Sequence, residues 1–360
     1  MPAKLEGEQV LAPYLRFQGT EYYCDKKEVG YRIVDFTQLG LPMKSLPQSL
    51  GVRPQALKLK FADKGQGRFL KNFLTQPQAV AQTRKTFGAL RPLDIVHRAY
   101  IGETVSRVYL PLTIQEGQLF DAVSGEMIGK LPGDRDIFAP AYDIEANWQP
   151  HFIPAVCPRC GWNLDGETDA IALSCSACET LWEIRDGKIS GLDYQVMPGG
   201  QKACLYLPFW KMAPEFAGIE MVSYAQFLRL TNQPVVVRSE WEKRKLFFWT
   251  PAFKVRPKTY LRLAKQLTVS QKEFEPQLIL PKRLHPVTLP VAEAIESLKI
   301  VLASATCNKK NILPILADIS CKVHKCSLVY LPFSVGHHEL MQEEFKININ
   351  NKVLEFSRYL

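Results

Sequence analysis

Four of the nine cysteines stand in two CxxC pairs, and this spacing predicts chemistry more clearly than any other part of the sequence. Cys157 and Cys160 form the first pair, and fourteen residues separate it from the second pair, Cys175 and Cys178. Each CxxC segment presents two thiolates from one tight turn, and two such turns supply the four sulfurs of a tetrahedral metal site. We therefore predict one structural zinc ion per chain, bound by these four cysteines.

The residues around the cysteines predict a small zinc ribbon. Asp165-Gly166 is typical of a turn, the runs Ala170–Leu173 and Thr180–Arg185 indicate short strands, and Trp182 is expected to cover the small core. Because four thiolates complete the coordination, no position remains for water or substrate, which favours a structural metal over a catalytic one. Iron in a rubredoxin-like site is a minor alternative, since thiolates also bind iron.

Motifs of known reaction classes are absent from the sequence. It contains no GxSxG, HExxH or kinase signature, and the glycine pair Gly65 and Gly67 lacks the rest of a phosphate-binding loop. The sequence therefore favours a protein that is not an enzyme, although an active site assembled from distant residues would be invisible at this level.

The net charge of +9 is concentrated in one region of the chain. Between Gln201 and Pro290 there are fifteen Lys and Arg residues against six Glu, and the remainder is neutral. Such an excess attracts nucleic acid, anionic lipid or an acidic protein surface, whereas a well-solvated surface is the simpler explanation.

One predicted helix carries the best-placed basic residues of this region. Pro257 is typical of a first helical position, and the pattern continues to about Gln271 with Lys258, Arg262 and Lys265 on one face. The candidate residues for contact with a partner or an anion are Lys254, Arg256, Lys258, Arg262 and Lys265.

A short aromatic phrase recurs along the chain. It reads Tyr109-Leu-Pro-Leu112, Tyr206-Leu-Pro-Phe209 and Tyr330-Leu-Pro-Phe333, with an echo at Tyr14-Leu-Arg-Phe17. Strand-like residues precede the three proline copies, and several copies are followed by a turn and a second extended run. Because proline in a sheet is confined to edges, first positions and bulges, we predict a repeated β-hairpin unit whose first strand is bent at the proline.

These patterns predict an α+β fold with repeated bent hairpins, a few helices and the ribbon. Besides the basic helix, residues 291–303 show the spacing of an amphipathic helix. We place domain boundaries near 148 and 195: an N-terminal α+β domain with YLxF and YLPL hairpins (1–148), the zinc ribbon (149–195), and a C-terminal α+β domain with YLPF hairpins and the basic helix (196–360).

Composition and apolar runs exclude two broad classes. With 46% apolar and 22% charged residues, the chain is neither disordered nor a membrane bundle. Runs such as Ala203–Trp210 are far shorter than the ~20 residues of a spanning helix, and the first ten residues lack the features of a secretion signal. We predict a cytoplasmic protein without a transmembrane segment.

The cysteine pattern CPRCG…CSAC, read together with LYLPFWK, FWTPAFKVRP and YLRLAKQLT, resembles a group of bacterial zinc-ribbon-containing proteins with no assigned reaction. The resemblance is strongest over about 155–275 and is specific for the ribbon. It implies a prokaryotic cytoplasmic protein with Cys157, Cys160, Cys175 and Cys178 as metal ligands, and it implies no catalytic residues.

The leading hypothesis is a non-enzymatic zinc-binding adaptor or scaffold that mediates protein–protein assembly, with peripheral membrane association left open. The alternative is a nucleic-acid-binding protein, because ribbons occur in such proteins and aromatic residues interleave with the basic ones: Phe247, Phe248, Trp249, Phe253 and Tyr260. A third hypothesis is an enzyme or redox protein with an unrecognised site.

Overall fold

The computed structural model describes residues 7–60, 67–75, 78, 81, 82, 85, 94–130, 152–185, 187–199 and 204–357. The chain divides into two compact units, the first comprising residues 1–19, 33–92 and 103–151 and the second 20–32, 93–102 and 152–360. Helices and mostly antiparallel sheets occur together, which agrees with the predicted α+β class. The division into three domains at 148 and 195 stays a prediction.

The first sheet follows the strand order β2-β1-β4-β5-β6, and β3 pairs in parallel with β1. A two-residue turn joins β4 to β5, and its residues Glu116 and Gly117 have φ angles of 48° and 76°. Positive φ at both positions is the signature of a type I′ turn, which matches the twist of a tight hairpin. The elements are β1 (Glu8–Cys24), β2 (Val29–Leu39), α1 (Arg53–Ala56), β3 (Arg68–Phe69), β4 (His97–Gln115), β5 (Gln118–Asp121) and β6 (Met127–Lys130).

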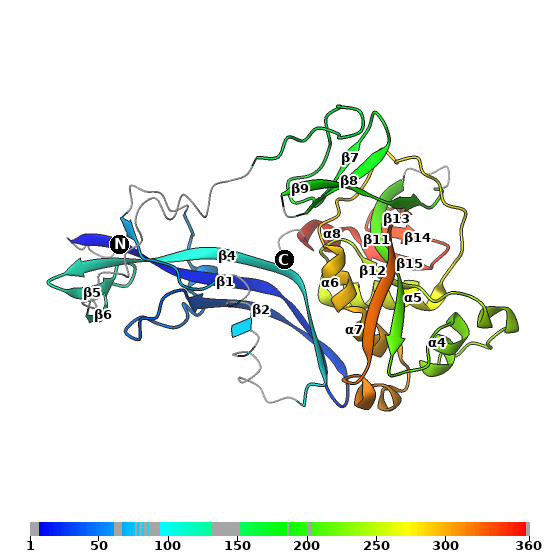
Figure 1. Cartoon of the computed structure of the whole chain (residues 1–360), viewed down its shortest axis with the longest axis horizontal. Coiled ribbons are helices and arrows are strands. Elements are labelled where there is room, and N and C mark those ends of the chain that lie inside the picture. The colour runs from blue at the N-terminus through cyan, green and yellow to red at the C-terminus, as the bar shows by residue number, and fades with distance from the viewer. Residues whose placement is uncertain are drawn as a thin grey trace. The chain divides into compact units, whose positions relative to one another are not determined.

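The second large sheet lies in the second unit and follows the order β12-β11-β13-β14-β15, with β10 parallel to β13 (Figure 1). Its strands are β10 (Tyr194–Val196), β11 (Cys204–Ala217), β12 (Phe248–Pro251), β13 (Ser320–Val335), β14 (Glu339–Gln342) and β15 (Ile347–Asn350). The helices of this unit are α4 (Tyr224–Leu230), η3 (Ser239–Glu242), α5 (Pro257–Ser270), α6 (Val291–Glu296), α7 (Leu298–Ala305), η4 (Lys309–Asn311), η5 (Leu313–Ile315) and α8 (Asn351–Ser357).

Both sheets connect their strands in the same way. In the first sheet the long strand β1 pairs with β2 on one side and with the long strand β4 on the other, and the hairpin β5–β6 extends the sheet from β4. In the second sheet β11, β12, β13 and the hairpin β14–β15 are arranged in the same way. The aromatic phrases lie in the four long strands β1, β4, β11 and β13. That this likeness reflects a repeated unit stays a prediction.

The prolines of the phrases occupy positions where no backbone donor is needed. Pro208 lies opposite Tyr330 in the β11–β13 ladder and directly before the residues that pair with β12. Pro332 lies between the segments of β13 that pair with β10 and with β14. The register passes through both positions without a shift, and the one irregularity of this ladder lies between Ala213 and Pro214. These two prolines are therefore tolerated without a shift in register, and the bend that we expected at them stays a prediction.

The helices confirm one expectation and refine another. α5 begins at Pro257 as predicted and buries Tyr260, Leu263 and Leu267 against the unit's core. The helix expected over 291–303 is divided into α6 and α7 at Ser297, whose hydroxyl donates to the Ala294 carbonyl oxygen (2.7 Å) and accepts a hydrogen bond from the Tyr260 hydroxyl (2.9 Å). Within the described residues, no helix combines the length and the apolar character that crossing a bilayer requires.

Side chains of α5 cover the free edge of β12. The hydroxyl of Thr268 accepts a hydrogen bond from the Trp249 backbone N–H (3.0 Å). One turn on, the Gln271 amide accepts from the Phe247 N–H (3.2 Å) and donates to the Phe247 carbonyl oxygen (2.8 Å). An unpaired strand edge is open to association with other chains, so these bonds both anchor the helix and close the sheet.

Replacing Thr268 with Val should lower the free energy of unfolding by about 1–3 kcal/mol, because Val keeps the shape but leaves the buried Trp249 N–H without an acceptor. Urea denaturation measures the change. Ser270→Ala on the same helix is the control and should change the stability by less than about 0.5 kcal/mol. Equal effects of the two substitutions would show that the edge bond does not matter.

Candidate metal centre

A small three-stranded antiparallel sheet and the loop before it hold the four cysteines. The sheet has the order β7-β8-β9, formed by β7 (Ala172–Cys175), β8 (Thr180–Arg185) and β9 (Lys188–Leu192). The first cysteine pair lies in a loop that returns to β7 through the bridge between Asp165 and Ser174, and the second pair spans the connection from β7 to β8. The second predicted strand coincides with β8, whereas β7 begins two residues later than the predicted run 170–173.

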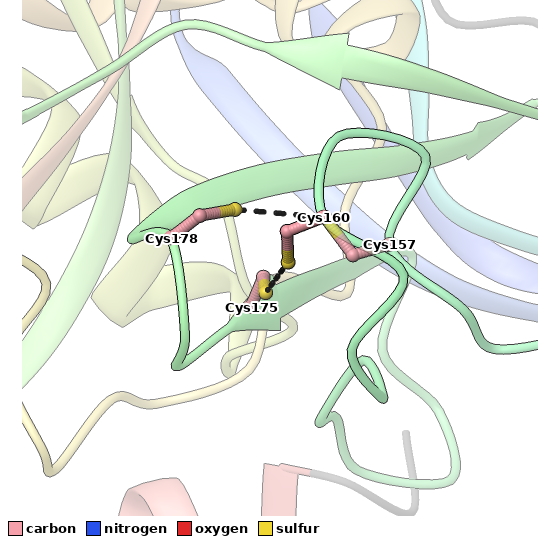
Figure 2. A group of neighbouring side chains, drawn as sticks. All are labelled: Cys157, Cys160, Cys175 and Cys178. Carbon is pink, nitrogen blue, oxygen red and sulfur yellow. Dashed lines mark hydrogen bonds between the residues drawn. The ribbon is translucent and has the colours of Figure 1, made fainter.

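The four sulfurs converge (Figure 2). The Sγ atoms of Cys157 and Cys178 are 3.6 Å apart, those of Cys160 and Cys175 are 3.5 Å apart, and all four lie within 4.8 Å of one another. Four thiolates around a tetrahedral zinc at the usual Zn–S distance have sulfurs about 3.8 Å apart. The cluster therefore fits a metal ion, and it is the one group of ligand-type side chains of this kind among the described residues.

Backbone geometry shapes both CxxC turns. The residue after each turn has the left-handed conformation: Gly161 with φ +75° and Glu179 with φ +54°. In the first turn the Gly161 N–H donates to the Cys157 carbonyl oxygen (2.9 Å), and the Cys157 N–H donates to that of Trp162 (2.7 Å). Glycine adopts this conformation freely, whereas a glutamate does so at a cost, so the second turn is strained where the first is not.

A side chain that the sequence did not single out, Thr180, contacts two of the sulfurs. The Thr180 hydroxyl lies 3.1 Å from Cys178 Sγ and 3.7 Å from Cys157 Sγ, and it accepts a hydrogen bond from Trp182 Nε1 (2.9 Å). Trp182 packs against the ribbon core, as predicted. Such outer contacts orient metal ligands. A threonine two residues after a CxxC pair gives no recognisable signal, because its role depends on the strand that follows.

The two cysteines of the first turn differ in how readily they form thiolates. A backbone hydrogen bond at Trp162 lowers the pKa of the Cys160 thiol, but burial and the neighbouring sulfurs raise it, to about 12. Burial raises the pKa of the Cys157 thiol. Hydrogen bonds from the backbone N–H groups of Cys160 and Arg159 and from the Thr180 side chain lower it by more than burial raises it, and the pKa falls to about 6. Backbone donors directed at a sulfur stabilise its charged form. Cys157 is thus prepared to bind a cation near neutral pH.

The basic residues proposed as a contact surface lie on or near α5. Arg256 and Lys258 are exposed, and Lys254 and Lys265 are partly exposed. Arg262 is bonded within the unit, because its guanidinium donates to the carbonyl oxygen (2.6 Å) and the side-chain oxygen (3.3 Å) of Asn348. The aromatic rings expected to stack on bases are mostly inaccessible, since Phe248, Trp249, Phe253 and Tyr260 are buried in the core.

Three exposed apolar side chains lie in the chain segment that contains the first CxxC turn. Phe152, Val156 and Trp162 are 90%, 43% and 59% exposed, and we refer to these three residues as the knuckle surface. A cavity of about 570 Å³ adjoins the second turn, where Asp165, Glu167 and Glu179 of the ribbon face the segment 280–287. The sequence contained Trp162 next to a cysteine pair, but its exposure could not be deduced from the pattern.

A scan against protein-family models and searches of curated proteins and of solved structures found no match to this chain. The geometry of the site and the surrounding surface therefore carry the functional interpretation.

Replacing Cys175 with Ser should abolish metal binding and unfold the ribbon, because the free energy of metal binding is folding free energy in so small a unit. Elemental analysis measures the metal, and hydrogen exchange of β7 and β8 measures the folding. The exposed Cys307, which lies outside the cluster, provides the control: Cys307→Ser should leave both unchanged. A Cys175→Ser protein with full metal content would refute the ligand assignment.

Replacing Glu179 with Gly should increase resistance to a chelator, because the strained left-handed residue becomes one that adopts the conformation freely, a gain of about 0.5–1 kcal/mol. Gly161→Ala should have the opposite effect at the matched position of the first turn. The chelator concentration that removes half of the metal is the readout. Changes of the same sign in both variants would contradict this account.

Proposed function

We propose that the protein is a non-enzymatic adaptor that binds one zinc ion in its ribbon and uses the folded ribbon to hold a protein partner. The observation that carries the proposal is a closed four-cysteine cluster next to an exposed apolar surface. The four sulfurs occupy every position of a tetrahedral ion, so the metal stabilises the ribbon and leaves no position for substrate.

Zinc is the proposed metal, and iron is its rival, because four thiolates suit both. Glutamate replaces glycine at the left-handed position of the second turn, so the two turns lack the symmetry of a rubredoxin-like site. An iron-loaded protein would absorb visible light through its thiolate ligands, whereas a zinc protein would be colourless.

The knuckle surface supports a protein partner. Phe152, Val156 and Trp162 together expose apolar groups that a protein seldom leaves in water without a use. Aromatic side chains of this kind supply most of the binding energy at protein interfaces. We therefore propose that the partner contributes an apolar segment that covers this surface.

Charge argues for a basic protein segment and against nucleic acid at the ribbon. Between Cys157 and Leu192 there are six acidic and three basic residues, and zinc bound by four thiolates adds two further negative charges. Asp165, Glu167 and Glu179 line the adjoining cavity, and Lys282 and His285 line its other side, so the lining has more acidic than basic groups. A phosphate backbone would be repelled here, whereas Lys or Arg residues flanking the partner's apolar segment would be attracted.

The double variant Val156→Ser, Trp162→Ser tests this proposal in the full chain purified with its partners from its native cells. We expect one zinc per chain in both proteins, and we expect the variant to lose a stoichiometric partner protein that the wild type retains, while its melting temperature is unchanged. The control is Val236→Ser, because Val236 is even more exposed than Val156 and Trp162 but lies outside the ribbon.

Three results would contradict the adaptor proposal. A partner retained equally by the double variant would exclude the knuckle surface. Co-purified nucleic acid that is released by salt, and lost in Lys258→Glu, Lys265→Glu, would favour the nucleic-acid alternative. Iron in place of zinc, with a visible spectrum that responds to reductant, would favour the redox alternative.

A further inference from the structure

Lys211 is a partly buried cation on the second sheet, distant in sequence from the ribbon. It lies directly opposite Trp249 in the β11–β12 ladder. Its Nζ is 4.5 Å from the ring centre of Phe247, 5.3 Å from that of Trp249 and 6.0 Å from that of Phe274. Within the described part of the chain, this ammonium group has no hydrogen bond or ion pair of its own.

Further cations surround this ammonium group. In the β11–β13 ladder Lys211 pairs with Ser327 and Ala213 pairs with Lys325, so Lys325 is the diagonal neighbour of Lys211 on the same face. Burial lowers the pKa of Lys211, Glu273 raises it, and Lys325 and Arg244 lower it further. The Glu273 carboxylate is already engaged, because it pairs with Arg244 Nε at 2.8 Å.

The surrounding rings do not balance this charge. An aromatic face attracts an ammonium group, but it does not cancel the repulsion from two neighbouring cations, and a partly desolvated charge is stable only with a counter-charge. Trp249 is itself buried, whereas Phe247 and Phe274 remain partly exposed beside the ammonium group. The arrangement thus places three cations, Lys211, Lys325 and Arg244, around the single Glu273 carboxylate and beside accessible apolar rings.

We infer that Lys211, Lys325 and Arg244 bind the carboxylate or phosphate group of an organic anion whose apolar part packs against Phe247 and Phe274. The anion supplies counter-charge beyond the one carboxylate of Glu273, which Arg244 already engages, and the two rings select a ligand with an aromatic or alkyl group over an inorganic ion. This site is formed by β11, β13 and the residues that flank β12 and α5. It does not depend on the metal centre or on the adaptor function.

Calorimetric titration of the full chain with 1-naphthyl phosphate tests the inference. We expect saturable binding at one site, tighter than the binding of 1-naphthol, which lacks the charge, and of inorganic phosphate, which lacks the ring. Binding should weaken as salt is added, because the contact is electrostatic. Absence of saturable binding, or equal binding of 1-naphthol, would overturn the inference.

Two variants locate the binding site. Lys211→Met keeps an unbranched chain among the rings and removes the charge, so it should weaken binding at least about tenfold without lowering the melting temperature. Lys325→Gln changes an exposed residue and should also weaken binding several-fold, which tests the site without disturbing the core. The exposed Lys352 on α8 provides the control, and Lys352→Gln should bind as the wild type does. Wild-type affinity in either Lys211→Met or Lys325→Gln would refute the site.

Discussion

The antiparallel pairing of β11 with β13 is the interaction on which the second unit depends. The ladder runs from the pair Cys204 and Ser334 to the pair Ala217 and Ser320, and the other strands of this sheet are added to its two members. β12 pairs with β11, whereas β10 and β14 pair with β13. Both faces of β11 are covered, since Phe209 and Trp210 point to opposite faces and both are buried. Strands covered on both faces tolerate little change in register, so the position of each attached element follows from this one ladder.

The metal centre has a different physical basis. Its ligands come from two turns close together in the sequence, and the ribbon core contains little apolar material besides the cysteines themselves, Leu164 and a few partly buried neighbours. A core of this size cannot offset the conformational entropy of its chain, so the ion substitutes for the missing burial. The ribbon is joined to the sheet through β10 and through the hydrogen bond from the Ile171 N–H to the Val287 carbonyl oxygen (2.8 Å). The surface around Trp162 can therefore be presented from a rigid support as long as the ion is bound.

Local patterns in the sequence predicted the local structure well. The CxxC spacing located the sulfur cluster, and Pro257 located the start of α5, because both depend on residues a few positions apart. Contacts between distant residues were not predictable. The division of the helix at Ser297 depends on Tyr260, and Lys211, counted among surface charges, is enclosed by rings from two other segments. The sequence assigned the proline phrases to strands correctly. The sheet tolerates Pro208 and Pro332 because the pairing with neighbouring strands begins or ends beside them, which the sequence does not show.

The separation of β11 and β13 in the sequence has a consequence during synthesis. About a hundred residues lie between Ala217 and Ser320, so the ribosome releases β11 well before its main partner exists. In that interval the apolar residues Leu207, Phe209 and Met212 have only local elements to cover them, chiefly β12, with α5 closing the outer edge. The other edge of β11 is open to any strand that meets it. A nascent chain of this protein thus passes through a stage at which association with its own copies competes with folding.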